Sequence, residues 1–177
     1  KSLIKGKLVK RYKRFFADIK LNEETIIAHC PNTGSMMGLL DEGNEVFVSK
    51  NNDPKRKLKY TLEIIKVKKN LVGVNTHFAN KIAFHGLSNN LIKEVVNNDN
   101  IKPEVFFDKE TRFDFLVEKN NRKTFVEVKN VTLVRKENLA EFPDAVTLRG
   151  SKHLKTLIEA TKKGYKSYLL FLVQIEG

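Results

Sequence analysis

The sequence predicts a mixed α/β (α+β) protein in which a small β-barrel is followed by a domain of helices and strands. Two observations support this fold class. The first 75 or so residues alternate apolar and polar side chains between tight turns, which is typical of short strands. Farther along, apolar residues recur at helical spacing between strand-like segments. The change lies near residues 75–85, so we expect two domains, 1–80 and 81–177.

Six short strands are expected in the first domain. Their limits come from the alternation and from turn residues, of which the segment from Pro31 to Ser35 is the strongest signal. Five or six short strands joined by tight turns are typical of a small closed barrel. The expected strands are 3–10, 14–21, 25–29, 45–48, 61–67 and 71–75.

The second domain is expected to contain two helices and three strands. A first helix is expected over 87–97, with Glu94 opposite its apolar side. A second begins after Ser151, a suitable N-cap, and stops at Gly164. Its apolar stripe is expected to consist of Leu154, Leu157, Ile158 and Thr161. The expected strands are 112–118, 123–131 and 168–175, the last apolar enough to be covered on both faces.

The net charge favours a polyanionic partner. Lys and Arg number 33 against 21 Asp and Glu, which gives +12 and an isoelectric point near 9.7. Coding bias is an alternative source of lysine, but it would scatter the charges. Residues 1–14 hold seven basic residues and no acid. A second cluster consists of Lys50, Lys55, Arg56, Lys57 and Lys59.

The sequence also favours a cytoplasmic location. No apolar run approaches the roughly 18 residues that a membrane span needs, and the N-terminus lacks the apolar stretch of a secretory signal. Cys30 is the single cysteine, so no internal disulfide can form, which fits a reducing compartment.

Two carboxylates and a lysine form the candidate catalytic site. If Asn120 and Asn121 make a two-residue hairpin turn, the paired residue numbers sum to 241 and Asp114 lies opposite Glu127. Lys129 then lies two positions along the same face. Two opposed carboxylates repel each other, and a divalent cation between them offsets this repulsion. Asp114 and Glu127 are therefore expected to bind Mg²⁺ or Mn²⁺. The alternative is a cross-strand salt bridge on an exposed face.

Candidate contacts to nucleic acid occur in both domains. Arg11, Lys13 and Arg14 interleave with Tyr12, which is expected to stack on bases. One of Phe15 and Phe16 is expected in the core instead. The backbone N–H groups of Asn32, Thr33 and Gly34 could hold a phosphate. A second candidate phosphate site is the start of the second helix, at Arg149, Lys152 and His153.

The other polar residues are assigned structural roles. Asp144 is expected to cap a turn. His77 and His85 are expected in loops, and Cys30 is expected to be a small buried side chain.

Six stretches of the chain resemble the sugar fermentation stimulation protein A family. They are LVKRYKRFFADI at 8–19, HCPNTGSMMG at 29–38, VNTHFAN at 74–80, ETRFDF at 110–115, VEVKNVTL at 126–133 and FPDAVTLRGSKHL at 142–154. The resemblance implies an N-terminal OB-fold barrel and a restriction-endonuclease-like α/β domain of the PD-(D/E)XK type, with a central mixed sheet. It implies non-specific binding of DNA, and it places Asp114, Glu127 and Lys129 on the nuclease pattern. Family members usually continue past residue 175, so the second domain is expected to be C-terminally incomplete.

Three functions follow as hypotheses. The first is a protein that binds double-stranded DNA and has a Mg²⁺-dependent phosphodiesterase site. The second is a catalytically silent DNA-binding regulator of sugar metabolism genes. The third is an RNA-binding barrel protein, which a competition assay between DNA and RNA would separate from the other two.

Overall fold

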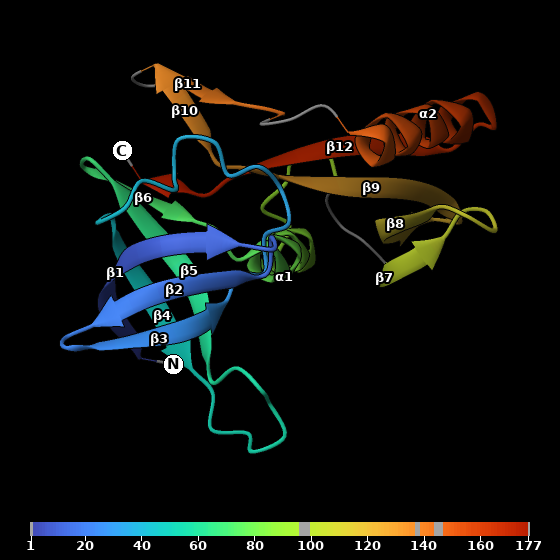
Figure 1. The fold of residues 1–177 in the computed structure, drawn as a ribbon. Helices are drawn as coiled ribbons and strands as arrows, with labels where there is room; N and C mark the ends of the chain where they lie inside the picture. Colours follow the sequence, from blue (N-terminus) through green and yellow to red (C-terminus); the bar gives the residue numbers. More distant parts are fainter. Residues whose placement is uncertain (1, 96–99, 137–138, 144–146, 177) are drawn as a thin grey trace. The chain divides into compact units, whose positions relative to one another are not determined.

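The computed structural model describes residues 2–95, 100–136, 139–143 and 147–176 (Figure 1). The chain folds as two compact units. The first contains Lys1–His77, Val131–Ala145 and Val173–Gly177, and the second contains Phe78–Asn130 and Val146–Leu172. The first unit thus takes in two segments from the later part of the chain. Among the described residues, no helix has the length and apolar character needed to cross a membrane.

All six strands expected in the first domain form, with bounds that differ by one or two residues. Five of them pair in a ring, in the order β1–β2–β3–β5–β4–β1, and only the β3–β5 pair is parallel. Beyond β5 the sheet continues through β6 to β13. The bounds are β1 (Leu3–Tyr12), β2 (Phe16–Leu21), β3 (Glu24–His29), β4 (Glu45–Lys50), β5 (Tyr60–Val67), β6 (Asn70–Gly73) and β13 (Ile175–Glu176).

Strand β1 is long enough to pair with two neighbours. Its first half pairs with β4 and its second half with β2, and Lys7 belongs to both ladders. Gly6 of β1 lies too close to β2 for a side chain, since a Cβ atom there would lie 2.8 Å from the Lys20 carbonyl oxygen. The absence of a side chain at Gly6 therefore lets one strand join both sides of the ring.

The inward side chains of these strands form the core of the first unit. Buried residues at alternate positions, such as Ala17 and Ile19 of β2, confirm the period-2 pattern. Cys30 is fully buried there, in the small apolar role that was expected. A separate two-stranded sheet, also in this unit, consists of β10 (Leu133–Lys136) and β11 (Leu139–Glu141).

The second unit contains a four-stranded sheet in the order β12-β9-β8-β7. The β8–β9 hairpin has the predicted register, from Lys119 opposite Arg122 to Phe115 opposite Val126. Asn120 and Asn121 both have positive φ, 48° and 61°, as a two-residue turn of this kind requires. The elements are α1 (Thr76–Ser88), β7 (Asn100–Phe106), β8 (Arg112–Lys119), β9 (Arg122–Val131), α2 (Leu148–Lys162) and β12 (Lys166–Val173).

Two helices cover opposite faces of this sheet (Figure 1). On one face, Ala79, Ala83 and Leu87 of α1 pack in a cluster with Phe115 and Val126. The other cluster lies against α2 and contains Phe113, Leu116, Phe125, Leu157 and Ala160.

The predicted helix over 87–97 is wrong. The helix ends at Ser88, residues 89–95 form turns that include Glu94, and residues 96–99 lie outside the described part. The sequence shows no clear apolar spacing for α1, because the buried face of the helix carries small alanines while Phe78 and Ile82 are about half exposed. His77 and His85 consequently lie on α1 and not in loops.

The second helix was predicted correctly, but its start and its buried face were not. Thr147 is the N-cap, and its hydroxyl accepts a hydrogen bond from the Gly150 N–H at 3.0 Å, so Ser151 lies inside the helix. The buried residues are Thr156, Leu157 and Ala160. Leu154 and Ile158 are 43% and 56% exposed.

Strand β12 is also less covered than expected. It lies at the edge of the sheet, and its residues are partly buried or exposed. The proposed cap Asp144 lies outside the described residues.

Candidate functional site

The carboxylate site lies where strands β8 and β9 cease to pair. The ladder ends at Phe115 opposite Val126, one pair before Asp114. At the next position, Oδ2 of Asp114 accepts a hydrogen bond from the Val128 N–H at 2.7 Å. The aspartate side chain thus takes the place of a backbone acceptor, which fixes it at the end of the hairpin ladder.

Helix α1 supplies a second donor to Asp114. The side-chain Nδ2 of Asn80 donates to Oδ1 of Asp114 at 2.8 Å. Each carboxylate oxygen therefore has a protein donor, so the orientation of Asp114 is set without any ligand. Asn80 was missed as a site residue, because 34 positions separate the two residues and the helix was placed too late in the chain.

Glu127 is the most buried charged residue of the site, at 3% exposure. Its Oε1 accepts hydrogen bonds from Lys129 Nζ and from His153 Nδ1, each at 2.5 Å. Its Oε2 is buried and has no hydrogen-bond partner among the described residues. A buried carboxylate oxygen without a partner is costly, on the order of 1–3 kcal/mol, so this atom is suited to an additional ligand.

A divalent cation would find few protein ligands here. Within the ranges that the structure describes, no three His, Cys, Asp or Glu side chains are grouped to hold a metal. The unpartnered Oε2 of Glu127 and the lone pairs that remain on Asp114 are hard oxygen donors, which fit a cation that keeps several waters, as Mg²⁺ does.

The three basic residues at the start of α2 have different surroundings. Arg149 is exposed in the first turn. Lys152 Nζ forms an ion pair with Glu110 at 2.6 Å, and the hydrogen bond to Glu110 raises the pKa of this lysine. His153 is directed to Glu127, with a side chain that is 12% exposed. Of the three, Arg149 is the one the structure leaves most open to a phosphate.

The β1–β2 turn presents two cations. Lys13 and Arg14 both have positive φ and are exposed at its tip. Arg11 behaves differently, because its guanidinium donates to the backbone carbonyls of Arg14 and Asn32 and ties the turn to the loop that follows β3. Arg14, expected in a strand, is a turn residue.

Two aromatic rings support this turn. The Tyr12 and Phe16 rings stack with centroids 5.5 Å apart, and Lys10 lies over the Tyr12 ring at 5.7 Å. Lost solvation and a hydrogen bond to Asp18 raise the pKa of the Tyr12 hydroxyl. The expectation that one of Phe15 and Phe16 lies in the core is wrong. Phe15 is 48% exposed, and Phe16 is only partly buried, because its ring stacks on Tyr12 near the turn.

The loop after β3 is held internally. Asn32 is buried, and its side-chain oxygen accepts a hydrogen bond from the Gly34 N–H at 2.8 Å. The Thr76 hydroxyl donates to the Pro31 carbonyl at 3.0 Å. Thr33 and Gly34 are exposed, but the Gly34 N–H already has a partner, which weakens the prediction that it holds a phosphate.

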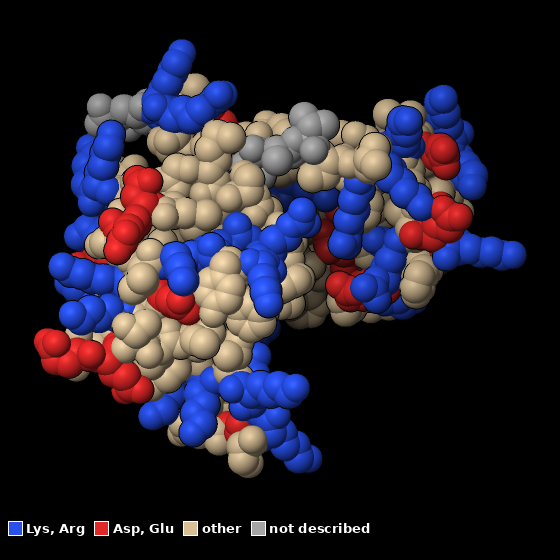
Figure 2. Space-filling view, in the orientation of Figure 1, with Lys and Arg blue, Asp and Glu red and all other residues tan. Residues whose placement is uncertain are grey.

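The second basic cluster lies at the end of β4, with Lys50, and on the loop between β4 and β5. Its five cations are all exposed, and Figure 2 shows Lys and Arg side chains gathered where this loop projects at the lower end of the view. Burial, followed by the charges of Arg56 and His77, lowers the pKa of His29. Arg56 of this cluster therefore lies close enough to His29 for its charge to act on the imidazole.

Comparison with known proteins identifies the family. Residues 9–74 match the model of the SfsA N-terminal OB domain, and residues 77–177 match the sugar fermentation stimulation protein RE domain. The chain belongs to the SfsA family. The resemblance noted in the sequence is confirmed, and strands β2 to β6 of the first unit lie within the residues that match the OB domain.

Curated SfsA relatives match almost the whole chain. A sugar fermentation stimulation protein homolog from Pelagibacter ubique is 85% identical over 100% of the chain and 76% of its own length. One from Pseudoalteromonas atlantica is 47% identical over 99% of the chain and 76% of its own length. The solved structure of Pyrococcus furiosus SfsA in complex with Ca²⁺ superposes with a TM-score of 0.88 at 24% identity, over 98% of this chain and 73% of that one.

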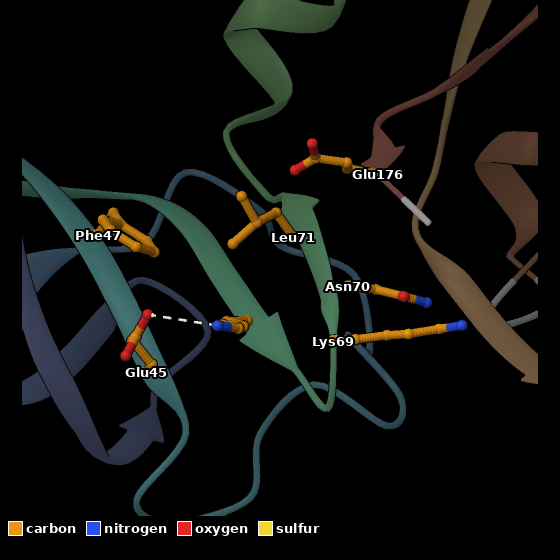
Figure 3. A pocket seen from close by; sticks show the side chains of 7 residues that line it. Glu45, Phe47, Lys69, Asn70, Leu71 and Glu176 are labelled. Atoms are coloured by element: carbon orange, nitrogen blue, oxygen red, sulfur yellow. Dashed lines mark ion pairs between the residues drawn. The ribbon is translucent and has the colours of Figure 1, made fainter.

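Two pockets of this SfsA chain lie on the first unit, and neither has Asp114, Glu127 or Lys129 among its lining residues. One of about 400 Å³ contains side chains of both charges, and its Glu45 and Lys66 form an ion pair at 4.0 Å (Figure 3). The mixed charge and open surroundings favour no particular ligand. Its lining residues are Glu45, Phe47, Lys66, Lys69, Asn70, Leu71 and Glu176.

Proposed function

We propose that this chain binds DNA through the phosphate backbone, without sequence preference, and that its second unit is a nuclease-like domain with a divalent-cation site. The family supports binding, because OB domains commonly bind nucleic acid. So does the charge of +12. The observation that carries the binding proposal is the exposed pair Lys13 and Arg14 at the tip of the β1–β2 turn, beside stacked aromatic rings.

The cation site would be formed by Asp114 and Glu127. The observation that supports it is the buried, unpartnered Oε2 of Glu127. The Ca²⁺ complex of the Pyrococcus furiosus relative adds support for a divalent ion. When bound, Mg²⁺ or Mn²⁺ would supply an acidified water and stabilise negative charge on a phosphate. Lys129 keeps a positive charge at Glu127, where it can orient a phosphate oxygen or a water.

A regulator that binds DNA without cutting it is the second candidate. The observation in its favour is that both oxygens of Asp114 and one oxygen of Glu127 already accept protein hydrogen bonds. Such a network can hold two helices to a sheet without any cation. The two candidates share the binding surface and differ only in chemistry.

Binding through the turn predicts a weaker salt dependence in a double variant. Replacing Lys13 and Arg14 with Ala should flatten the slope of log affinity against log salt by about 1.8, since each phosphate contact contributes about 0.9. Fluorescence anisotropy with a labelled duplex over a range of NaCl concentrations measures the slope. Arg11 is left intact because it holds the turn together.

The control removes the same charge from other places. Lys5 and Lys102 are each paired with a glutamate, at 2.5 Å and 2.9 Å. Their double Ala variant should bind with nearly the parent slope. Equal slopes in parent and turn variant would contradict the proposed surface. A single-stranded RNA competitor that displaces the duplex at equal concentration would favour the RNA-binding alternative.

Cleavage separates the two candidate functions. With Mn²⁺, the parent protein is expected to nick supercoiled plasmid. Glu127→Gln should reduce the rate at least about 100-fold, because it removes a ligand of the cation that would stabilise negative charge on the phosphate. Gel analysis of a time course, with a chelator control, gives the rate. Glu118→Gln is the matched control, because Glu118 is on the same hairpin and forms a surface ion pair with Lys102. A parent that binds DNA and never nicks it would contradict the nuclease proposal and favour a catalytically silent DNA-binding protein.

A further inference from the structure

We infer that His153 is a positioning residue that orients Glu127 so that one carboxylate oxygen is presented to the cation. This inference rests on the proposed cation site. It replaces the sequence hypothesis in which His153 contacts a phosphate directly.

The contact between His153 and Glu127 fixes the plane of the carboxylate. The terminal torsion of a glutamate is broad, so the group rotates freely unless donors hold it. Here His153 Nδ1 and Lys129 Nζ both lie 2.5 Å from the same oxygen, Oε1. Two donors on one oxygen leave Oε2 as the atom available to an incoming ligand, and Oε2 is the one without a partner among the described residues.

The ring of His153 has a defined role in this contact. An ionised carboxylate only accepts hydrogen bonds, so Nδ1 must carry a hydrogen to donate to Glu127. The side chains of His153 and Glu127 are 12% and 4% exposed. A donor so well shielded from water has little freedom to exchange its partner for solvent.

Contacts on both sides of His153 hold α2 to the segment that precedes β8. Just before it, Lys152 pairs with Glu110 at 2.6 Å. One turn later, the Thr156 hydroxyl lies 3.3 Å from the hydroxyl of Thr111, which is 1% exposed. The helix therefore holds His153 in place before any cation binds, as a preorganised site requires.

The experiment measures uptake of Mn²⁺ by calorimetry on the full chain without DNA. His153→Ala is expected to weaken Mn²⁺ affinity about 10- to 100-fold, the usual effect of losing a residue that orients a metal ligand. His153→Asn should recover most of the affinity, because its amide nitrogen can occupy the place of Nδ1. His153→Gln should recover little, because its amide reaches one bond farther. Lys155→Ala, an exposed change on the same helix, should match the parent.

Each outcome decides the matter. If the parent takes up no Mn²⁺, the proposed cation site fails and this inference fails with it. If the parent binds and His153→Ala binds equally well, the cation site stands and the positioning role is wrong. An Asn variant no better than the Gln variant also overturns it, and this comparison remains valid where the Ala variant does not fold. If the folded variants bind DNA more weakly than the parent in chelator, the result would contradict the positioning role and support a direct contact between His153 and a phosphate.

Discussion

Replacing Lys129 with Met is expected to lower the free energy of unfolding by about 3–5 kcal/mol in metal-free buffer. The side chains of Lys129 and Glu127 are 17% and 4% exposed and form an ion pair at 2.5 Å. Removing Lys129 leaves the buried Glu127 carboxylate with His153 as its remaining partner, and loss of one partner of a buried ion pair costs about that much. Urea unfolding followed by circular dichroism, in chelator, measures the loss.

The cation site makes this loss partly reversible. Mn²⁺ should restore stability in Lys129→Met, because it supplies positive charge to Glu127 and binds only the folded state. Adding Glu127→Gln should also relieve the penalty and abolish the response to Mn²⁺. Lys102→Met is the control, because its exposed pair with Glu118 should contribute no more than about 1 kcal/mol. An unchanged unfolding curve for Lys129→Met would show that Glu127 is not held as a buried anion.

Replacing Phe113 with Ala is expected to destabilise the second unit by about 3–5 kcal/mol. Phe113 is fully buried, and its ring lies 5.6 Å from Phe107 and 5.2 Å from Phe125, between centroids. Alanine leaves a cavity where β8 packs against α2. Differential scanning calorimetry of the parent and the variant gives the difference.

A nearby phenylalanine provides the matched control for that change. Phe106 on β7 is 66% exposed, so Phe106→Ala should change stability by less than about 1 kcal/mol. Equal losses in the two variants would mean that the cluster around Phe113 is not the core of the unit.

The sequence predicted local structure better than it predicted contacts. The β8–β9 register followed from Asn120-Asn121, since a two-residue turn fixes every later pair. Alternation along one strand predicted that Lys129 and Glu127 share a face, and their side chains form an ion pair there. By contrast, Asn80 and His153 reach their carboxylates across 34 and 26 positions, and no local pattern encodes which helix face meets a strand.

The errors have physical causes. Helix α1 buries small residues and exposes large ones, so apolar spacing pointed to a later segment. Strand β7 was missed because it contains Pro103 and a positive φ at Glu104, and both features are unusual inside strands. The divergence of β8 from β9 at Asp114 was hidden because a regular hairpin was assumed to continue.

The division of the chain into two units has a consequence for how the protein is synthesised. In the first unit, Ile175 and Glu176 of β13 pair with Val72 and Leu71 of β6. A ribosome releases β6 about 100 residues before β13, so during translation β6 remains an unpaired edge strand while the second unit is made. A fragment that stops at residue 80 would keep that edge permanently, and we expect it to self-associate when expressed alone.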